Sequence, residues 1–366
     1  MRILAIDVGT GTQDILLFDS SLTVENNPKM VMPSATTIIA RRIGQATREG
    51  NDVLLTGVTM GGGPCSWAAE AHLKAGHKVF ATPDAARTFD DHLENVERAG
   101  IRVVSEDEAK VLARKEDVAC IEMKDLYLDA IEQALEAFGV EPAYNGVAVA
   151  VFDHGAAPVD VSDRTFRFDH LRRVVEQNDS LLSFGYLADE VPPYLTRMLS
   201  VVRTYPARLD APLFLLDTAP AGALGALGDT LVRSHQERLL VNLGNMHATA
   251  FHLQGDRIVG LFEHHTGLID QGKLNMLLER LVDGTLRNSD VFDDHGHGAH
   301  IFGGNSAAPF LAVTGPQRAL LRGSPLQPHF AVPYGDMMLS GCFGLVRGFA
   351  GIVPQWREEI EQALEG

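Results

Sequence analysis

The residues with the clearest chemical potential lie near the start of the chain, in the string Asp7-Val-Gly-Thr-Gly-Thr-Gln-Asp14. Apolar runs at residues 3–6 and 15–18 flank this string and predict the two strands of a β-hairpin. Glycines let a backbone approach a ligand closely, and converging N–H groups bind anions. We therefore expect the turn to bind a phosphate, with a carboxylate and two threonine hydroxyls beside it.

Two commoner phosphate-binding loops do not fit this segment. The dinucleotide fingerprint G-x-G-x-x-G opens a helix, whereas Asp14 stands at the third glycine and β-type residues follow it. The Walker string G-x-x-x-x-G-K-[ST] occurs nowhere in the sequence. A glycine-rich turn without a ligand remains the alternative interpretation.

A second segment, residues 238–251, repeats the order of apolar run, glycine turn and apolar run. The two segments are separated by about 230 residues, and their similarity predicts an internal duplication of the fold. The residues of the second turn that could contact a ligand are Gly244, Asn245, His247 and Thr249. His247 could bind a phosphate or merely fill space beside the turn.

Histidines and carboxylates are concentrated in two further stretches. Glu263, His264 and His265 follow a predicted strand, and residues 293–300 form a dense His/Asp run that includes His295 and His297. Such groups at short spacing can bind Zn²⁺ or another transition metal. We expect an active-site role for Glu263 and His264, while a transition metal and a plain histidine-rich loop both stay open.

Composition limits the classes of function. With 366 residues the chain can form two domains. Its net charge of −17 argues against binding to nucleic acid or to an anionic membrane surface. No apolar run has the length of a membrane-spanning helix, and no signal-peptide pattern precedes the first strand. Three widely spaced cysteines favour a reduced cytoplasmic setting.

The hairpin around Asp7 resembles the first phosphate motif of the superfamily of sugar kinases, Hsp70 and actin. The resemblance implies an α/β protein with two actin-like (ribonuclease H-like) domains, each with a βββαβαβα core, flanking a nucleotide cleft. We expect the first domain at residues 1–208, with an insertion or connecting segment at about 160–208. The second domain would span residues 209–366, with its last helix packing back on the first.

The same resemblance implies ATP and Mg²⁺ as ligands and assigns roles to individual residues. Asp7 would hold the metal, and Asp14 would be either a second metal carboxylate or the residue that pins the turn. The terminal phosphates would contact Gly9, Thr10, Gly11 and Thr12, and on the other side Gly244, Asn245 and His247. Gly315, in residues 310–318, would form the turn that packs on the adenine.

Two positions carry particular weight in this interpretation. Asn242 stands where the superfamily has an aspartate, so the charge that would help to hold the metal is missing there. Asp153 follows a buried strand at residues 146–152 and would orient the attacking hydroxyl or water. The alternative for Asp153 is a strand-end residue that caps the next segment.

The whole chain also resembles a small group of prokaryotic proteins that are labelled pyruvate formate-lyase activating enzymes. The strings that carry this resemblance are residues 6–14, 152–156, 262–267 and 334–338, the last of which contributes Asp336 as a further candidate. The label conflicts with the sequence, because the chain has no Cys-x-x-x-Cys-x-x-Cys cluster for an iron–sulfur centre. The resemblance therefore predicts the fold better than the activity.

Three functions follow as expectations. The first is an ATP-binding phosphotransferase or ATPase that acts on a small molecule or partner of unknown identity. The second is a nucleotide or metabolite sensor that does not hydrolyse ATP and regulates a partner enzyme. The third is a metal-dependent transferase or hydrolase that uses the histidines.

Overall fold

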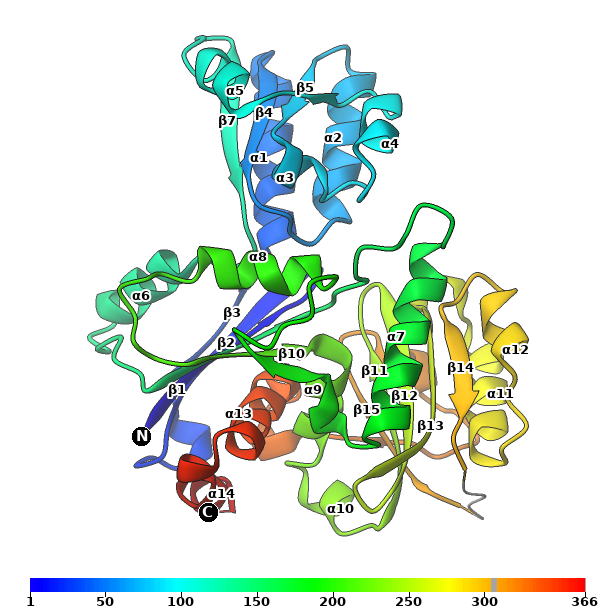
Figure 1. Cartoon of the computed structure of the whole chain (residues 1–366). Coiled ribbons are helices and arrows are strands. Elements are labelled where there is room, and N and C mark those ends of the chain that lie inside the picture. The colour runs from blue at the N-terminus through cyan, green and yellow to red at the C-terminus, as the bar shows by residue number, and fades with distance from the viewer. Residues whose placement is uncertain (304–307, 366) are drawn as a thin grey trace.

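The first of the three sheets begins with the predicted hairpin (Figure 1). In the computed structural model, which describes residues 1–303 and 308–365, its strand order is β3-β2-β1-β8-β10-β9. The first three strands form an antiparallel meander, and the next two lie parallel to β1. The strands are β1 (Arg2–Val8), β2 (Thr12–Asp19), β3 (Lys29–Pro33), β8 (Gly146–Val151), β9 (Gly185–Leu187) and β10 (Leu213–Asp217).

The second sheet repeats this order. It runs β14-β13-β12-β11-β15-β16, so that β11, β12 and β13 form the meander and the next two strands are parallel to β11. The duplication predicted from the two glycine turns is thus confirmed, and with it the actin-like fold class. The strands are β11 (Glu237–Leu243), β12 (His247–Gln254), β13 (Arg257–His265), β14 (Gly298–Ile301), β15 (Phe310–Thr314) and β16 (His329–Phe330).

A third sheet was not predicted. Its four parallel strands, ordered β6-β5-β4-β7, form a separate layer of strands and helices at the top of Figure 1. Sequence periodicity predicts the strands themselves, but it cannot say which sheet a strand joins. The elements are α1 (Ala35–Glu49), β4 (Asp52–Gly57), α2 (Pro64–Lys74), β5 (Val79–Ala81), α3 (Pro83–Ala86), α4 (Leu93–Arg98), β6 (Arg102–Val103), α5 (Glu106–Leu112) and β7 (Val118–Met123).

The predicted boundary at residue 209 needs correction. Strand β10 lies beyond that boundary, yet it pairs in parallel with β8 and completes the first sheet. All five of its residues are buried, because the strand lies in the middle of a packed sheet. The connecting segment is also more than a linker: α7 (Asp163–Gln177) packs against β14 of the second sheet, and α8 (Thr196–Thr204) adds Met198 and Val201 to the core of the first.

Two small-residue helices join the halves at the centre of the molecule. These are α9 (Thr218–Ala226) and α13 (Ser340–Ile352), which lie in close contact. A Cβ on Gly344 would stand 1.8 Å from the backbone oxygen of Ala221, and one on Gly225 would stand 1.6 Å from that of Ser340. The two backbones therefore touch directly, and α13 reaches β1.

The remaining helices cover the sheets and the chain ends. They are α6 (Leu128–Ala137), α10 (Thr230–Arg233), α11 (Gln271–Val282), α12 (Asn288–Phe292) and α14 (Arg357–Glu365). Short 3₁₀ turns are η1 (Val24–Asn26), η2 (Leu181–Phe184), η3 (Thr266–Leu268), η4 (Arg318–Leu321), η5 (Pro333–Gly335) and η6 (Pro354–Trp356). Helix α14 packs on the first half, where Glu359 pairs with the N-terminal amine at 2.6 Å.

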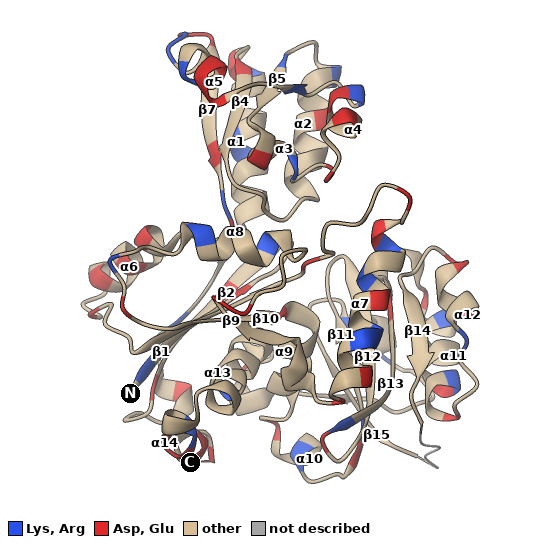
Figure 2. Cartoon of the chain, viewed as in Figure 1, with Lys and Arg blue, Asp and Glu red and all other residues tan. Residues whose placement is uncertain are grey.

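Lys and Arg are interspersed with Asp and Glu in each part of the described chain (Figure 2). Within residues 1–303 and 308–365, none of the helices has both the length and the apolar character needed to cross a bilayer.

The close contact of α9 and α13 predicts a large effect for a small substitution. Gly344→Ala should lower the free energy of unfolding by about 1–3 kcal/mol, because the new methyl group cannot fit without a backbone shift. Gly44→Ala, in the interior of α1, is the matched control, because a Cβ there would make only ordinary contact at 3.6 Å with the Arg48 side chain. The control should raise stability by about 0.5–1 kcal/mol. Urea unfolding measures both changes, and equal effects would contradict this account of the contact.

Candidate functional site

The two predicted turns have the same backbone geometry. In the first turn, residues 9–12, the N–H of Gly9 donates to the carbonyl of Thr12 at 3.0 Å. In the second turn, residues 244–247, the N–H of Gly244 donates to the carbonyl of His247 at 2.9 Å. The duplication therefore extends from the strand order down to the hydrogen bond that closes each turn.

The two turns face one another across one cavity, which we call the central cavity. Its volume is about 120 Å³, and a Cβ on Gly11 of the first turn would lie 2.6 Å from Nδ2 of Asn245 in the second. Every residue predicted to contact the nucleotide or its metal lines this space: Asp7, Gly9, Thr10, Gly11, Thr12, Asp14, Asn242, Gly244, Asn245, His247 and Gly315. Residues that the sequence interpretation missed also line it, including Arg197, Thr218, Ser340 and Gly341.

Two carboxylates stand side by side at the base of the first turn. Asp7 and Asp14 are partners across the β1–β2 ladder. Burial raises the pKa of Asp7 to about 7, while the hydroxyl of Thr218 donates to its Oδ1 at 3.3 Å and opposes this rise. Burial and the neighbouring charge of Asp7 raise the pKa of Asp14 to about 8. Oδ1 of Asp14 is buried and has no hydrogen-bond partner among the described residues.

This pair fits a divalent cation. Two adjacent buried carboxylates repel one another, and an unpaired buried oxygen costs free energy. Mg²⁺ favours carboxylate and water oxygens and would remove both penalties. The start of α13 adds to the enclosure, since a Cβ on Gly341 would stand 1.9 Å from Oδ2 of Asp7.

The matching position in the second half is uncharged. Asn242 faces Thr249 across the β11–β12 ladder, as Asp7 faces Asp14. The Nδ2 group of Asn242 donates to Oγ1 of Thr314 at 3.3 Å. The fold is therefore duplicated, but the acidic pair is present in one half alone.

Gly315 follows β15 with a φ of +96°, and a Cβ there would stand 2.4 Å from the carbonyl oxygen of Leu243. A positive φ and this close approach both require glycine. Asp336 lies outside the residues that line the central cavity; its carboxylate pairs with Lys29 at 3.4 Å and accepts from the N–H of Met338.

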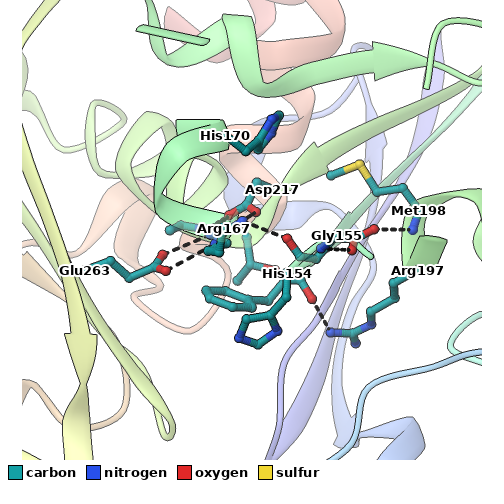
Figure 3. A network of polar contacts seen from close by, with 12 residues as sticks. His154, Gly155, Arg167, His170, Arg197, Met198, Asp217 and Glu263 are labelled. Carbon is teal, nitrogen blue, oxygen red and sulfur yellow. Dashed lines mark hydrogen bonds and ion pairs between the residues drawn. The ribbon is translucent and has the colours of Figure 1, made fainter. Parts of the chain in front are cut away.

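The carboxylate of Asp153 is held by backbone groups. One of its oxygens accepts from the N–H of Gly155 at 2.8 Å, and the other accepts from the N–H of Met198 at 2.9 Å (Figure 3). This geometry favours the capping interpretation over a role in orienting the acceptor. Asp153 nevertheless lines a second cavity of about 340 Å³, the outer cavity, which shares Gly9, Thr10, Phe152, Arg197, Met246 and His247 with the central one.

The histidines of the sequence interpretation separate into two groups. Side chains alternate along a strand, so Glu263 and His265 of β13 point to one face and His264 points to the other. His264 bonds Oδ2 of Asp294 at 3.0 Å, and we find no place for it in the site. His295 occupies a turn with a φ of +66°.

Three histidines from distant segments do come together. Nε2 of His297 lies 3.3 Å from Nε2 of His154, and a ring nitrogen of His247 completes a group within 4.8 Å. The ring of His265 is 4.8 Å from that of His297, centroid to centroid. Burial lowers the pKa of His154 to about 4 and also lowers the pKa values of His247, His265 and His297. His154 lies within the string at residues 152–156, but the sequence predicted no role for it. Its place directly after Asp153 was the available signal.

The central and outer cavities lie in a chain of known family. A family model described as "Putative pyruvate format-lyase activating enzyme (DUF1786)" matches residues 60–320. The chain belongs to this family. The sequence resemblance to the group with that label is thus confirmed. Among the described residues, the one group of at least three His, Cys, Asp or Glu side chains that could hold a metal ion consists of histidines.

Solved structures with similar architecture have low sequence identity. The Lmo2764 protein from Listeria monocytogenes matches at 10% identity with a TM-score of 0.36, over 96% of this chain and 99% of that one. The activator of the 2-hydroxyisocaproyl-CoA dehydratase from Clostridium difficile, with bound ADPNP, matches at 10% identity and a TM-score of 0.34, over 98% of each chain. A ROK family transcriptional regulator, described as a homolog of the E. coli MLC protein, matches at 12% identity and a TM-score of 0.26. In that case the match covers 70% of this chain and 37% of the other. No curated protein matches the sequence.

The hydrogen bonds and ion pairs within the site are centred on Arg167 of α7. This fully buried side chain donates from Nε and Nη2 to both oxygens of Glu263, at 3.1 and 2.9 Å, and from Nη1 and Nη2 to both oxygens of Asp217. Nη1 also donates to the carbonyl of Asp153 at 3.0 Å. Figure 3 shows Arg167 between the two carboxylates, with His154 close by. Sequence patterns gave no sign of this role in a helix of polar appearance.

Loss of Arg167 should destabilise the fold strongly. Arg167→Leu removes the cation that neutralises two buried carboxylates and should cost about 3–5 kcal/mol. Arg172→Leu is the matched control, because Arg172 lies on the same helix and pairs only at the surface; its cost should stay under about 1 kcal/mol. Denaturant unfolding compares the two. Similar losses for both variants would show that the buried network contributes little.

The acidic pair predicts a pH-dependent effect. The pKa of Asp14 is higher in the folded chain than its ordinary value of 3.8, so its ionisation costs stability increasingly as the pH rises from about 4 to about 8. Without divalent cations, Asp14→Asn should therefore gain stability over the original chain at pH 8.5 and gain less at pH 4.5. Exposed Asp160 provides the control Asp160→Asn, for which we expect no such difference. Denaturant unfolding in a chelating buffer at both pH values tests this, and a gain that is larger at pH 4.5 would contradict it.

Proposed function

We propose that this protein binds ATP with Mg²⁺ in the central cavity and acts as a phosphotransferase or ATPase. The observation that carries the proposal is the pair of turns with identical closing hydrogen bonds, which face each other across one cavity. A nucleotide phosphate chain offers charged oxygens on both sides, so two opposed glycine turns with backbone N–H groups and hydroxyls suit it.

The acidic pair supports the metal part of the proposal. Asp7 and Asp14 are the residues that would hold Mg²⁺, because they combine adjacent carboxylates with a buried oxygen that lacks a partner. The bound ion would neutralise charge on the transferring phosphate. The protein's own contribution would be to position the reactants, with Thr218 fixing the orientation of Asp7.

The outer cavity is the proposed site of the phosphate acceptor. It meets the central cavity at Gly9, Thr10 and Arg197, so a molecule bound there would face the first turn. Arg197 is fixed at this junction, since it binds both oxygens of Asp125 at 2.7 and 3.0 Å and the carbonyl of Phe152 at 2.8 Å. Acidic groups also border the outer cavity, and burial raises the pKa of one of them, Asp91, to about 6.

Calorimetry with Mg²⁺ and ATP tests the proposal. The original chain should bind ATP in a Mg²⁺-dependent manner, and Asp7→Ala should weaken binding by about tenfold or more, as expected for the loss of about 1.4 kcal/mol. Asp256→Ala, at a side chain that is 94% exposed, is the control and should bind normally. Absence of ATP binding to the original chain would overturn the proposal.

A second function is favoured by one observation. The uncharged pair of Asn242 and Thr249 removes a carboxylate that could assist turnover, which suits a sensor that closes on a nucleotide without hydrolysing it. Measurement of phosphate release over a broad panel of acceptors separates the two. ATP binding without any release would favour the sensor.

A further inference from the structure

Three histidines meet beside the junction of the two cavities, although they come from distant parts of the sequence. The first and the last of them, His154 and His297, are 143 residues apart. His154 follows the end of β8, His247 begins β12, and His297 directly precedes β14. His297 is 1% exposed, and a ring nitrogen from each of the three lies within 4.8 Å of the others. Histidines brought together from three strand ends by the fold need an explanation beyond local sequence.

The spacing of two of the three histidines suits metal coordination. The two Nε2 atoms of His154 and His297 are 3.3 Å apart. Zn²⁺ binds imidazole nitrogen at about 2.0–2.1 Å in tetrahedral geometry, for which two ligand atoms are separated by about 3.3 Å. A hydrogen bond between the two neutral rings would also suit this distance. That bond would leave the nearby nitrogen of His247 without a role.

Unpartnered ring nitrogens are the second observation. Nε2 of His247 and Nδ1 of His297 are buried and have no hydrogen-bond partner among the described residues. Buried polar atoms are rarely left in this condition. His247 belongs to the group of three, and a ligand placed beside its ring could satisfy the unpartnered nitrogen.

Glu263 lies behind one of the rings. Its Oε1 lies 3.7 Å from Nδ1 of His297, and both of its oxygens are fixed by Arg167. With its proton on Nδ1, His297 would direct the lone pair of Nε2 at His154. Metal-binding histidines characteristically have such a carboxylate behind them.

The surrounding charge permits a cation. The guanidinium of Arg167 lies 4.0 Å from the centre of the Phe152 ring, which itself stacks on His247. Two carboxylates, those of Asp217 and Glu263, neutralise this guanidinium and leave the local network with a net negative charge. Of the two guanidiniums that act on His297, Arg167 is thus compensated, while Arg164 donates to the carbonyls of Phe292 and Gly296.

We propose that His154, His247 and His297 bind one divalent transition-metal ion, with Zn²⁺ as the ion best suited to the site. Three protein ligands leave a fourth position open, as in catalytic zinc sites. His154 and His247 line the outer cavity, so the ligand at this position would be an oxygen of water or of an anionic group bound there. The metal site does not depend on the proposed nucleotide function, and of the histidines at 264–265 and 295–300 that the sequence indicated it includes His297.

The test is metal stoichiometry and affinity of the full chain. After removal of metal with a chelator, the protein is titrated with Zn²⁺ and, in parallel, with Co²⁺, whose visible spectrum reports four-coordinate geometry. We expect one ion per chain. His154→Asn and His247→Asn should each weaken Zn²⁺ binding by more than about 100-fold, because loss of even a supporting residue behind a ligand costs about 10–100-fold.

Controls make the outcome decisive. His300→Asn, on β14 three residues beyond His297, should bind Zn²⁺ like the original chain. His154 and His247 are only partly buried, and circular dichroism of each variant checks that it has folded. No stoichiometric Zn²⁺ or Co²⁺ in the original chain, or equal affinity in the variants, would overturn the proposal.

The metal and nucleotide proposals can fail separately. Asp7→Ala should keep its Zn²⁺ while losing Mg²⁺-dependent ATP binding, and His154→Asn should do the reverse. Zn²⁺ binding in a chain that fails to bind ATP would leave the histidine site standing.

Discussion

The buried guanidinium of Arg167 is the interaction on which both parts of the site depend. It uses all five of its N–H donors within the protein, on two carboxylates and one carbonyl. Asp217 comes from the last strand of the first sheet, and Glu263 comes from the meander of the second. A single side chain from the connecting segment therefore ties the two halves together at the level of the cavities.

Each of the two carboxylates that bind Arg167 also contacts or lies beside a further group of the site. Asp217 caps α9 by accepting from the N–H of Ala219 at 3.1 Å, and the next residue, Thr218, holds Asp7. Glu263 stands behind His297. Because buried charges need well-placed partners, displacement of Arg167 would disturb the acidic pair and the histidines together.

Local patterns made the two turns predictable. A glycine turn between two apolar runs can be read from about fifteen residues, and every residue assigned there to a phosphate or its metal lines the central cavity. The third sheet and the membership of β10 could not be predicted in this way, because strand pairing depends on contacts between distant segments. The grouping of His154, His247 and His297 could not be predicted from the sequence for the same reason. The sequence pointed to the dense run at residues 293–300 and to Glu263 and His264. Alternation along β13, however, directs the side chain of His264 away from the site.

His247 links the two parts of the site physically. It is the last residue of the second turn, it lines both cavities, and its ring stacks on Phe152 beside His154 and His297. A phosphate held by the second turn and a metal held by the histidines would therefore share one side chain. A ligand that fixes the position of the His247 ring changes how well the other ligand can bind to this ring, and such coupling is reciprocal. The duplicated fold thus supplies two matching turns. The second turn differs from the first in having Asn242 in place of Asp7 and His247 in place of Thr12, and these are the positions where the chemistry of the two halves differs.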